Sequence, residues 1–209
     1  MFTKALLPNT VRALKLVSKI SIVRGGYLAG GTDLALHIGH RISVDLDFFT
    51  SKVFDEKTLS GELNQLPEYK EEGTAWRTVW GEMAKTKFSL FYYKYPLIKK
   101  TIVFEGVQIL DKEDIAAMKI HAIEDRGTKR DFIDLYFLSK EFTLEQMLEF
   151  YDQKYDTLEE HLYMIIRSLS YFEDAEIEES PKMLTSVSWE EVKKFFQKNS
   201  IALAKKRLI

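Results

Sequence analysis

Cysteine is absent from this sequence, which excludes disulfide bonds and thiolate metal sites. Histidine is scarce, and its scatter over positions 37, 40, 121 and 161 disfavours a zinc site. No apolar run reaches the roughly 20 residues of a membrane-spanning helix, and the N-terminus lacks the apolar stretch and cleavage site of a signal peptide. These absences predict a cytoplasmic protein without a membrane partner, in which any metal is a hard, oxygen-preferring cation.

An excess of charge of one sign is also missing, because the formal net charge is only -2. The whole chain therefore carries no electrostatic signature of a nucleic-acid partner, and local patches must supply that argument. Hydrophobic residues make up 45% of the chain and charged residues 30%, a balance that predicts a folded protein rather than a disordered one.

The first half of the chain carries the patterns of a sheet. Residues Ile42–Phe48 alternate between polar and apolar and predict a strand. Residues 69–109 are rich in aromatic and β-branched side chains and predict antiparallel strands with turns at glycine and proline. We therefore expect a core with a mixed or antiparallel sheet over residues 1–110.

The second half carries helical patterns from Asp111 onward. Thr143 with Gln146 resembles a capping box, and so does Ser188 with Glu191. The fold class expected is α+β, with the sheet-containing core followed by a helical region over residues 111–209.

Two aspartates on the predicted strand are candidate metal ligands. The side-chain period of a strand is two, so Asp45 and Asp47 should share one face while Val44, Leu46 and Phe48 point into the core. Their α-carbons would lie about 7 Å apart. Such a pair suits Mg²⁺, or Mn²⁺ in its place, because Mg²⁺ takes one or two protein carboxylates and completes its shell with water and phosphate oxygens. An Asp-x-Asp pair alone is also compatible with a solvent-facing strand edge.

A glycine turn precedes these aspartates. Gly30 and Gly31 allow a close backbone approach, and Thr32 can cap a helix whose unpaired N–H groups favour a phosphate. The Thr32 hydroxyl is a further candidate phosphate contact. A Gly-Gly-Thr sequence alone is compatible with an ordinary turn, but a turn and an aspartate pair joined by one short helix predict a site for a metal-bound nucleoside triphosphate.

Two blocks of sequence resemble a known family. Residues 27–49, YLAGGTDLALHIGHRISVDLDFF, resemble the first motif of the polymerase-β-like nucleotidyltransferase superfamily. Residues 119–138, KIHAIEDRGTKRDFIDLYFL, resemble the Lys-x6-Arg-x3-Arg-Asp-x2-Asp-Leu-Tyr signature of the AbiEii/MenA-type nucleotidyltransferase toxins of bacterial toxin-antitoxin systems. The resemblance implies that residues 1–110 form a nucleotidyltransferase-like core and that residues 111–209 complete its active-site cleft.

The second block also has a physical interpretation. On one continuous helix, Lys119, Arg126, Arg130 and Asp134 would share a stripe about 80° wide that can face a triphosphate. Gly127 opposes this, because glycine costs roughly 1 kcal/mol inside a helix and can divide it. The alternative is that Arg130 and Asp134 form an ordinary surface pair one helical turn apart.

The resemblance implies roles for these residues. Lys119 is the expected point charge on the phosphates, and Arg126 and Arg130 are expected phosphate or RNA contacts. The resemblance also implies a functional role for one aspartate of the Arg-Asp-x2-Asp segment. We rank Asp131 below Asp134, because Asp131 falls about 120° from Lys119 on an ideal helical wheel.

One feature of the wider superfamily is missing. Many of its enzymes place a third carboxylate on a later strand, whereas the corresponding segment here, Lys87–Tyr93, contains none. A one-metal mechanism assisted by Lys119, a carboxylate from the helical half and a binding-only descendant of the enzyme fold all stay open.

A local basic patch runs from Ala84 to Phe104, with five lysines, no acidic residue and several aromatic side chains. Basic residues among aromatics can follow a nucleic-acid backbone and stack bases. The alternative is an amphipathic strand pair whose lysines protect a sheet edge.

The function expected is transfer of a nucleoside monophosphate from a nucleoside triphosphate to an acceptor. By resemblance the acceptor is RNA, such as the 3′ end of tRNA, and the chain is a toxin with a cognate antitoxin. A protein or small-molecule acceptor is a second possibility, and a non-catalytic nucleotide-binding module is a third.

Overall fold

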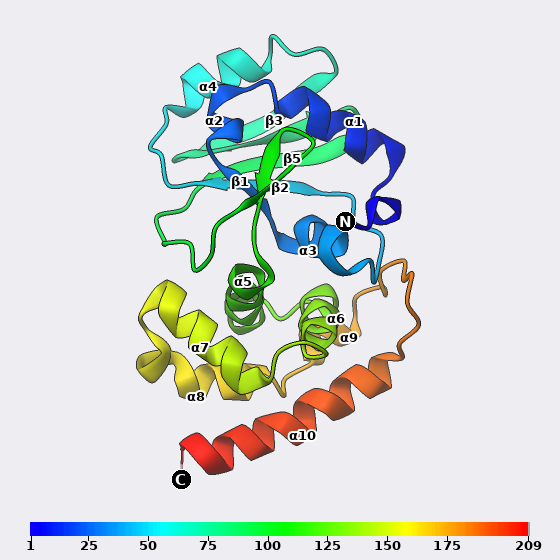
Figure 1. Cartoon of the computed structure of the whole chain (residues 1–209), viewed down its shortest axis with the longest axis vertical. Helices are drawn as coiled ribbons and strands as arrows, with labels where there is room; N and C mark the ends of the chain where they lie inside the picture. Colours follow the sequence, from blue (N-terminus) through cyan, green and yellow to red (C-terminus); the bar gives the residue numbers. More distant parts are fainter. Residues whose placement is uncertain (209) are drawn as a thin grey trace. The chain divides into compact units, whose positions relative to one another are not determined.

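The computed structural model describes residues 1–208, which divide into two compact units, one over residues 1–111 and one that begins at residue 112. The first unit contains a mixed sheet of seven strands in the order β3-β4-β5-β2-β1-β7-β6 (Figure 1). The sheet and its helices comprise η1 (Thr3–Ala5), α1 (Pro8–Val17), α2 (Ser21–Arg24), β1 (Tyr27–Ala29), α3 (Gly30–Ile38), β2 (Leu46–Thr50), α4 (Glu56–Leu63), β3 (Tyr69–Ala75), β4 (Thr78–Met83), β5 (Thr86–Tyr92), β6 (Ile102–Phe104) and β7 (Val107–Ile109).

One face of this sheet forms the hydrophobic core of the first unit. Phe48 and Phe88 are fully buried on it and pack in one cluster with Leu14 of α1, Val23 of α2 and Leu63 of α4. The alternation of a strand sends the intervening side chains to the opposite face. The helices therefore cover one face, and the opposite face is left to carry polar and aromatic side chains.

The strand order confirms the expected mixed sheet. β3, β4 and β5 pair antiparallel, as do β6 and β7, whereas β5 runs parallel to β2 and β7 runs parallel to β1. These parallel pairs join strands that are far apart in the sequence. They bring β2, which carries Asp47, between β1 and β5.

The strand predicted over Ile42–Phe48 is displaced in the structure. β2 begins only at Leu46, because the chain before it forms an isolated bridge between Ser43 and Leu6. Leu46 and Phe48 are fully buried as predicted, but the expectation that Val44 points into the core is wrong, since Val44 is 41% exposed. Asp45 thus lies just before the strand rather than within it.

The second unit is helical. It comprises α5 (Lys112–Asp125), α6 (Lys129–Leu138), α7 (Leu144–Tyr155), α8 (Leu158–Ser168), α9 (Glu173–Glu176) and α10 (Trp189–Arg207). Thr143 and Gln146 form the predicted capping box at α7, and Ser188 accepts the Glu191 N–H at the start of α10. Within residues 1–208 no helix is long and apolar enough to cross a membrane.

Buried polar and aromatic contacts hold these helices together. The Lys154 Nζ to Asp114 Oδ1 ion pair, at 2.7 Å, joins α7 to α5 with both side chains fully buried. Phe132 of α6 packs edge to face against Phe196 of α10 with ring centroids 5.3 Å apart. A buried pair is costly to desolvate, so it contributes little net stability, but removal of either partner alone would be strongly destabilising.

Candidate nucleotide and metal site

Asp47 lies at the point where β1 ends and α3 begins. The antiparallel register of β1 and β2 pairs Ala29 with Asp47. Asp47 Oδ2 is 3.7 Å from the position that a β-carbon on Gly30 would occupy. Gly30 has a φ of 73°, in the left-handed region that favours glycine. The turn that starts α3 therefore brings the backbone close to a carboxylate.

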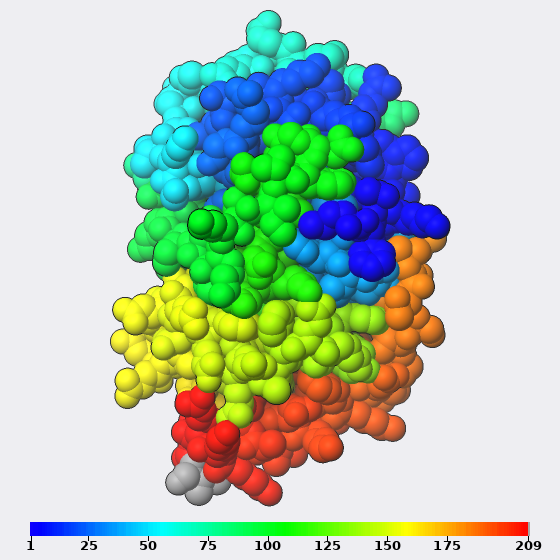
Figure 2. Space-filling view, in the orientation of Figure 1, coloured from blue at the N-terminus to red at the C-terminus, as the bar shows by residue number. Residues whose placement is uncertain are grey.

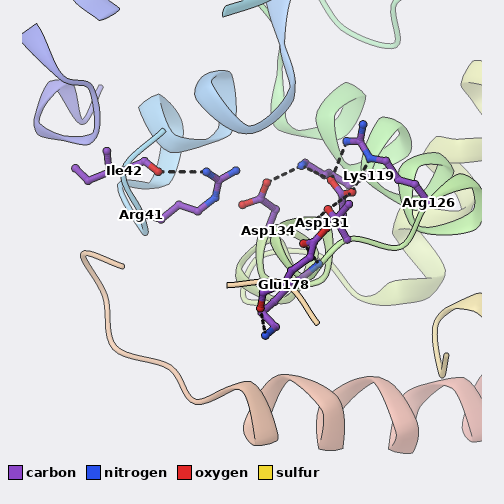
Figure 3. A network of polar contacts seen from close by, with 9 residues as sticks. Arg41, Ile42, Lys119, Arg126, Asp131, Asp134 and Glu178 are labelled. Carbon is purple, nitrogen blue, oxygen red and sulfur yellow. Dashed lines mark hydrogen bonds and ion pairs between the residues drawn. The ribbon is translucent and has the colours of Figure 1, made fainter. Parts of the chain in front are cut away.

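A buried arginine packs against the same turn. Arg41 is only 4% exposed, and its guanidinium occupies the space that a side chain at position 31 would fill. Its Nη1 donates to the Ile42 carbonyl at 3.2 Å (Figure 3). Arg41 was not among the residues predicted from the sequence. The available signal was a basic residue between the glycine turn and the aspartate pair.

Thr32 holds the segment that leads to the aspartates. Its buried hydroxyl contacts Ser43 Oγ at 2.9 Å and donates to the Asp45 carbonyl. The predicted capping role is wrong, because Ala29 is the N-cap and no side chain caps this helix. Gly30 starts the helix two residues earlier than expected, which places Thr32 inside the first turn.

The first turn of α3 can bind an anion. The backbone N–H groups at the start of a helix have no partner within the helix, and here they belong to Gly30, Gly31 and Thr32. The helix dipole and the buried Arg41 add positive potential at this point. The arrangement suits a phosphate, whether or not the Thr32 hydroxyl takes part.

The carboxylates beside this turn are compatible with a hard divalent cation. Asp45 and Asp47 are both partly exposed, so a ligand can reach them. Within residues 1–208 no group of three or more acidic, histidine or cysteine side chains could hold a metal ion. A pair of carboxylates fits Mg²⁺, which accepts water and phosphate oxygens as its other ligands.

The register also identifies the side chain of β5 that lies next to Asp47. β5 runs parallel to β2 and pairs Ser89 with Asp47. Residues in register project to the same face of a sheet, so Ser89 is the β5 side chain next to Asp47. A hydroxyl is a weaker metal ligand than a carboxylate, which agrees with the absence noted in the sequence.

The middle of α3 is held by a buried acid and base. Asp33 is fully buried and accepts the Leu110 N–H at 2.9 Å, while His37 Nε2 lies 3.4 Å from Asp33 Oδ1. Burial raises the pKa of Asp33 to about 6, although His37 and the Leu110 N–H act against it. Burial lowers the pKa of His37, but the Asp33 carboxylate outweighs burial and raises it above its usual value.

These shifts predict that the chain becomes less stable as the pH rises. The folded state binds more protons than the unfolded state wherever a folded pKa exceeds the unfolded one. For Asp33 the folded state holds this extra proton from about pH 3.8 to about pH 6, and for His37 it does so above pH 6.5. Between about pH 5 and pH 7.5 we expect the deprotonation of Asp33 to lower the free energy of unfolding by on the order of 1 kcal/mol. Urea unfolding of Asp33→Asn should show a smaller loss of stability over this interval than the native chain.

Asp55→Asn is the matched control for this prediction. Hydrogen bonds from Thr58 lower the pKa of Asp55, so its carboxyl titrates below the chosen interval. Asparagine also keeps the N-cap of α4. Equal pH slopes for the native chain and Asp33→Asn would contradict the assignment.

The second block of the sequence forms two helices instead of one. α5 ends at Asp125 and α6 begins at Lys129, with Gly127 at a φ of 53° and Thr128 as the N-cap of α6. The continuous helix considered for residues 119–134 is therefore wrong, for the reason that Gly127 suggested. The angular argument for ranking Asp131 below Asp134 fails with it.

The break brings both aspartates to one lysine. Lys119 Nζ lies 2.8 Å from Asp131 Oδ1 and 2.6 Å from Asp134 Oδ2, and all three side chains are buried (Figure 3). Asp134 is fully buried, whereas the alternative of a surface pair with Arg130 placed its carboxylate on the exposed face of a helix. The folded chain brings together the three residues Lys119, Asp131 and Asp134.

Arg126 completes this network at its exposed side. Its Nε lies 3.0 Å from Asp131 Oδ2 while its side chain is 61% exposed. Burial alone would raise the pKa of Asp131, but Lys119 and Arg126 outweigh burial and hold it far below the usual value. Asp131 is therefore ionised at neutral pH. Arg130 lies exposed on α6.

Comparisons with known proteins agree with these features. The family described as "Nucleotidyl transferase AbiEii toxin, Type IV TA system" matches residues 92–202. A relative from Aquifex aeolicus (strain VF5), the uncharacterized protein aq_aa25, is 36% identical over 192 residues, which cover 89% of this chain and 91% of the relative.

Two solved structures share the fold. JHP933 from Helicobacter pylori has a TM-score of 0.52 at 21% identity, covering 94% of this chain and 90% of its own. The nucleotidyltransferase toxin MenT4 from Mycobacterium tuberculosis H37Rv has a TM-score of 0.55 at 16% identity, covering 93% and 84%. These likenesses extend over almost the whole chain, including the first unit that the family model covers little of. The chain belongs to the AbiEii nucleotidyltransferase toxin family and is a nucleotidyltransferase.

Proposed function

We propose that this chain transfers a nucleoside monophosphate from a nucleoside triphosphate to the end of an RNA, such as the 3′ end of tRNA. The observation that supports this most is the position of Asp47 beside the first turn of α3. In this arrangement the first turn of α3 would bind a phosphate, and Asp47 would bind the metal ion of the same triphosphate. The reaction class follows from membership of the nucleotidyltransferase family.

The first unit supplies the proposed nucleotide and metal ligands. Asp45 and Asp47 would hold Mg²⁺ or Mn²⁺, which would supply positive charge next to the triphosphate. The backbone N–H groups of Gly30, Gly31 and Thr32 bind phosphate oxygens. Fixing these groups before the substrate arrives lowers the barrier through positioning and charge stabilisation.

The second unit supplies the proposed positive charge. Lys119 is the point charge that opposes negative charge on the reacting phosphates, and Asp131 and Asp134 hold its ammonium in place. Arg126 and Arg130 contact phosphate oxygens of the nucleotide or the RNA. Lys119 and Asp134 are the residues proposed here to be catalytic, together with the aspartates of the first unit.

The proposed reaction is a substitution at the α-phosphorus. The oxygen of the acceptor hydroxyl forms a bond to that phosphorus, and the phosphorus loses its bond to the bridging oxygen of the departing pyrophosphate. The proton of the acceptor hydroxyl passes to a carboxylate or to solvent. The products are pyrophosphate and an RNA that is longer by one nucleotide.

The direct experiment is to incubate the purified chain with α-labelled nucleoside triphosphates, Mg²⁺ and total RNA. We expect a labelled RNA band that is lost in Asp45→Ala/Asp47→Ala. Label in the protein with an unlabelled RNA pool would show a protein acceptor instead. Failure to bind any nucleoside triphosphate by calorimetry with Mg²⁺ present would contradict transfer to any acceptor.

We also propose that the chain acts as a toxin controlled by an antitoxin. The support is the description of the matching family as a toxin of a type IV system. Expression in a bacterial host should arrest growth, and Asp47→Asn should abolish the arrest. Arrest that persists in Asp47→Asn would separate toxicity from nucleotidyl transfer.

Gly31→Ala should weaken nucleotide binding. A β-carbon at position 31 overlaps the guanidinium of Arg41, which is buried and has little room to move. The substitution therefore displaces either Arg41 or the helix start that binds phosphate. Loss of one charge-assisted contact weakens binding by about 10-fold or more. Calorimetric titration with a nucleoside triphosphate and Mg²⁺ measures this change.

Gly61→Ala is the control for this substitution. Gly61 lies in α4, and a β-carbon there would meet nothing within 4 Å. It should leave nucleotide affinity unchanged and raise stability by about 0.5–1 kcal/mol, because alanine is the better helix former. Equal nucleotide affinities for Gly31→Ala and Gly61→Ala would argue against phosphate binding at the α3 turn.

A further inference from the structure

A row of aromatic rings crosses the first unit next to Asp47. Tyr27 on β1 pairs in register with Phe49 on β2, and Phe49 pairs with Phe91 on β5. The Phe49 centroid lies 6.2 Å from that of Tyr27 and 5.2 Å from those of Phe91 and Tyr93, and Tyr95 lies 5.0 Å from Tyr93. We call these five residues the aromatic row.

The aromatic row shares the sheet face of Asp47. Residues two apart in a strand project to the same side, so Phe49 follows Asp47 at an α-carbon distance of about 7 Å. On β5, Phe91 follows Ser89 in the same way, and Ser89 is the register partner of Asp47. The row therefore begins one step along the strands from the proposed metal ligands.

The exposure of these rings differs from that of core aromatics. Phe48 and Phe88, on the opposite face of the same strands, are fully buried in the apolar cluster. Within the row only Tyr27 is buried, whereas Phe49, Phe91, Tyr93 and Tyr95 are partly exposed. Four rings thus keep surface available for a ligand.

Positive charge extends along the segment that continues from the row. Lys94, Lys99 and Lys100 lie exposed between β5 and β6, and the segment that leads on to β7 lies at the surface in green (Figure 2). Lys94 Nζ is 5.6 Å from the Tyr95 ring centroid. Lys87 on β5 pairs in register with the acidic Glu82 on β4. The positive charge near the row therefore comes from the lysines after Tyr93.

We infer that the aromatic row binds the unpaired end of the RNA acceptor, with bases stacked on the rings and phosphates held by the lysines that follow. This inference rests on the proposed transfer to RNA. Rings combined with lysines are the usual means of holding a single strand, because every base has a face to stack and every linkage carries a negative charge. The position next to Asp47 would bring the end of such a strand toward the metal ligands.

The test measures RNA affinity in the absence of nucleotide. A fluorescein-labelled short single-stranded RNA is titrated with the full chain by fluorescence anisotropy, and a blunt duplex of the same sequence is titrated in parallel. Phe91→Leu and Tyr95→Leu keep apolar volume but remove the rings. We expect each to weaken binding of the single strand by about 10-fold or more, and we expect the native chain to prefer the single strand.

Trp76→Leu is the matched control. Trp76 is an aromatic residue of the same unit, 70% exposed, and it lies in the turn between β3 and β4 outside the row. It should leave RNA affinity unchanged. Thermal unfolding of all variants establishes that they are folded, and calorimetry with a nucleoside triphosphate and Mg²⁺ measures nucleotide affinity separately.

The outcomes separate this inference from the proposed function. Unchanged RNA affinity in folded Phe91→Leu and Tyr95→Leu would overturn the inference, and so would a loss confined to nucleotide affinity, which would assign the row to the base of the nucleotide. RNA affinity that depends on the row, without any transfer of label to RNA, would support RNA binding by the row but overturn the proposed transfer and with it the role of that RNA as acceptor.

Discussion

Asp47→Asn is expected to lower the rate of nucleotidyl transfer by about 10³-fold, the upper range for removal of one preorganised electrostatic group. Asparagine keeps the size of the side chain, but its neutral amide binds a divalent cation and opposes phosphate charge poorly. Phe48 and Leu46, which pack the strand, are unaffected. Incorporation of α-labelled nucleotide into RNA, measured at saturating Mg²⁺, gives the ratio of rates.

Glu62→Gln is the control for charge removal in the first unit. Glu62 is exposed on α4, a helix of the face opposite Asp47. Glu62→Gln removes one negative charge, as Asp47→Asn does, and should retain full activity. If Asp47→Asn retained activity within a few-fold of the native chain, the proposed site in the first unit would be wrong.

Lys119→Met is expected to destabilise the second unit by about 3–5 kcal/mol, the usual cost of removing one partner from a buried ion pair. Lys119 is 4% exposed and lies between Asp131 and Asp134. Its loss leaves two buried carboxylates without the ammonium that lies between them, although Arg126 and the Thr128 hydroxyl still contact Asp131. Urea unfolding followed by helical circular dichroism measures the change.

Compensating substitutions give this prediction a sharper form. Lys119→Met combined with Asp131→Asn and Asp134→Asn removes the unpaired charges, and should recover much of the lost stability without recovering transfer activity. Lys112→Met is the control on the same helix. Its ion pair with Glu141 is partly exposed, so its loss should cost at most about 1 kcal/mol. Equal costs for Lys119→Met and Lys112→Met would contradict the role of burial.

The candidate residues of the site were largely accessible from local sequence. Gly30 was recognisable as part of a turn because few other residues adopt its left-handed backbone. The spacing of Asp45 and Asp47 suggested the two-residue period of a strand, although Asp45 lies just before β2. Their assigned functions stay predictions. The packing of Leu46 and Phe48 followed from the same alternation and is confirmed.

Local rules failed where a distant contact decided the geometry. Val44 was expected in the core, but the bridge between Leu6 and Ser43 before it and the hydrogen bond from Thr32 to the Asp45 carbonyl after it hold this segment outside the strand. Arg41 was missed, because only the folded loop shows its guanidinium against Gly31. Asp131 was ranked low on a helical wheel that the left-handed Gly127 makes inapplicable.

The sequence by itself determined the fold class, the family and the identity of the candidate residues, because these depend on residue type, period and spacing along the chain. Tertiary structure alone decided which groups meet. Ala29 and Ser89 flank Asp47 because β1, β2 and β5 pair across long separations. The same is true of Lys119 and its two aspartates, which meet because a helix ends at Asp125 and another begins at Lys129. Strand pairing and helix packing are set by the burial of apolar surface over the whole chain, which no local pattern contains.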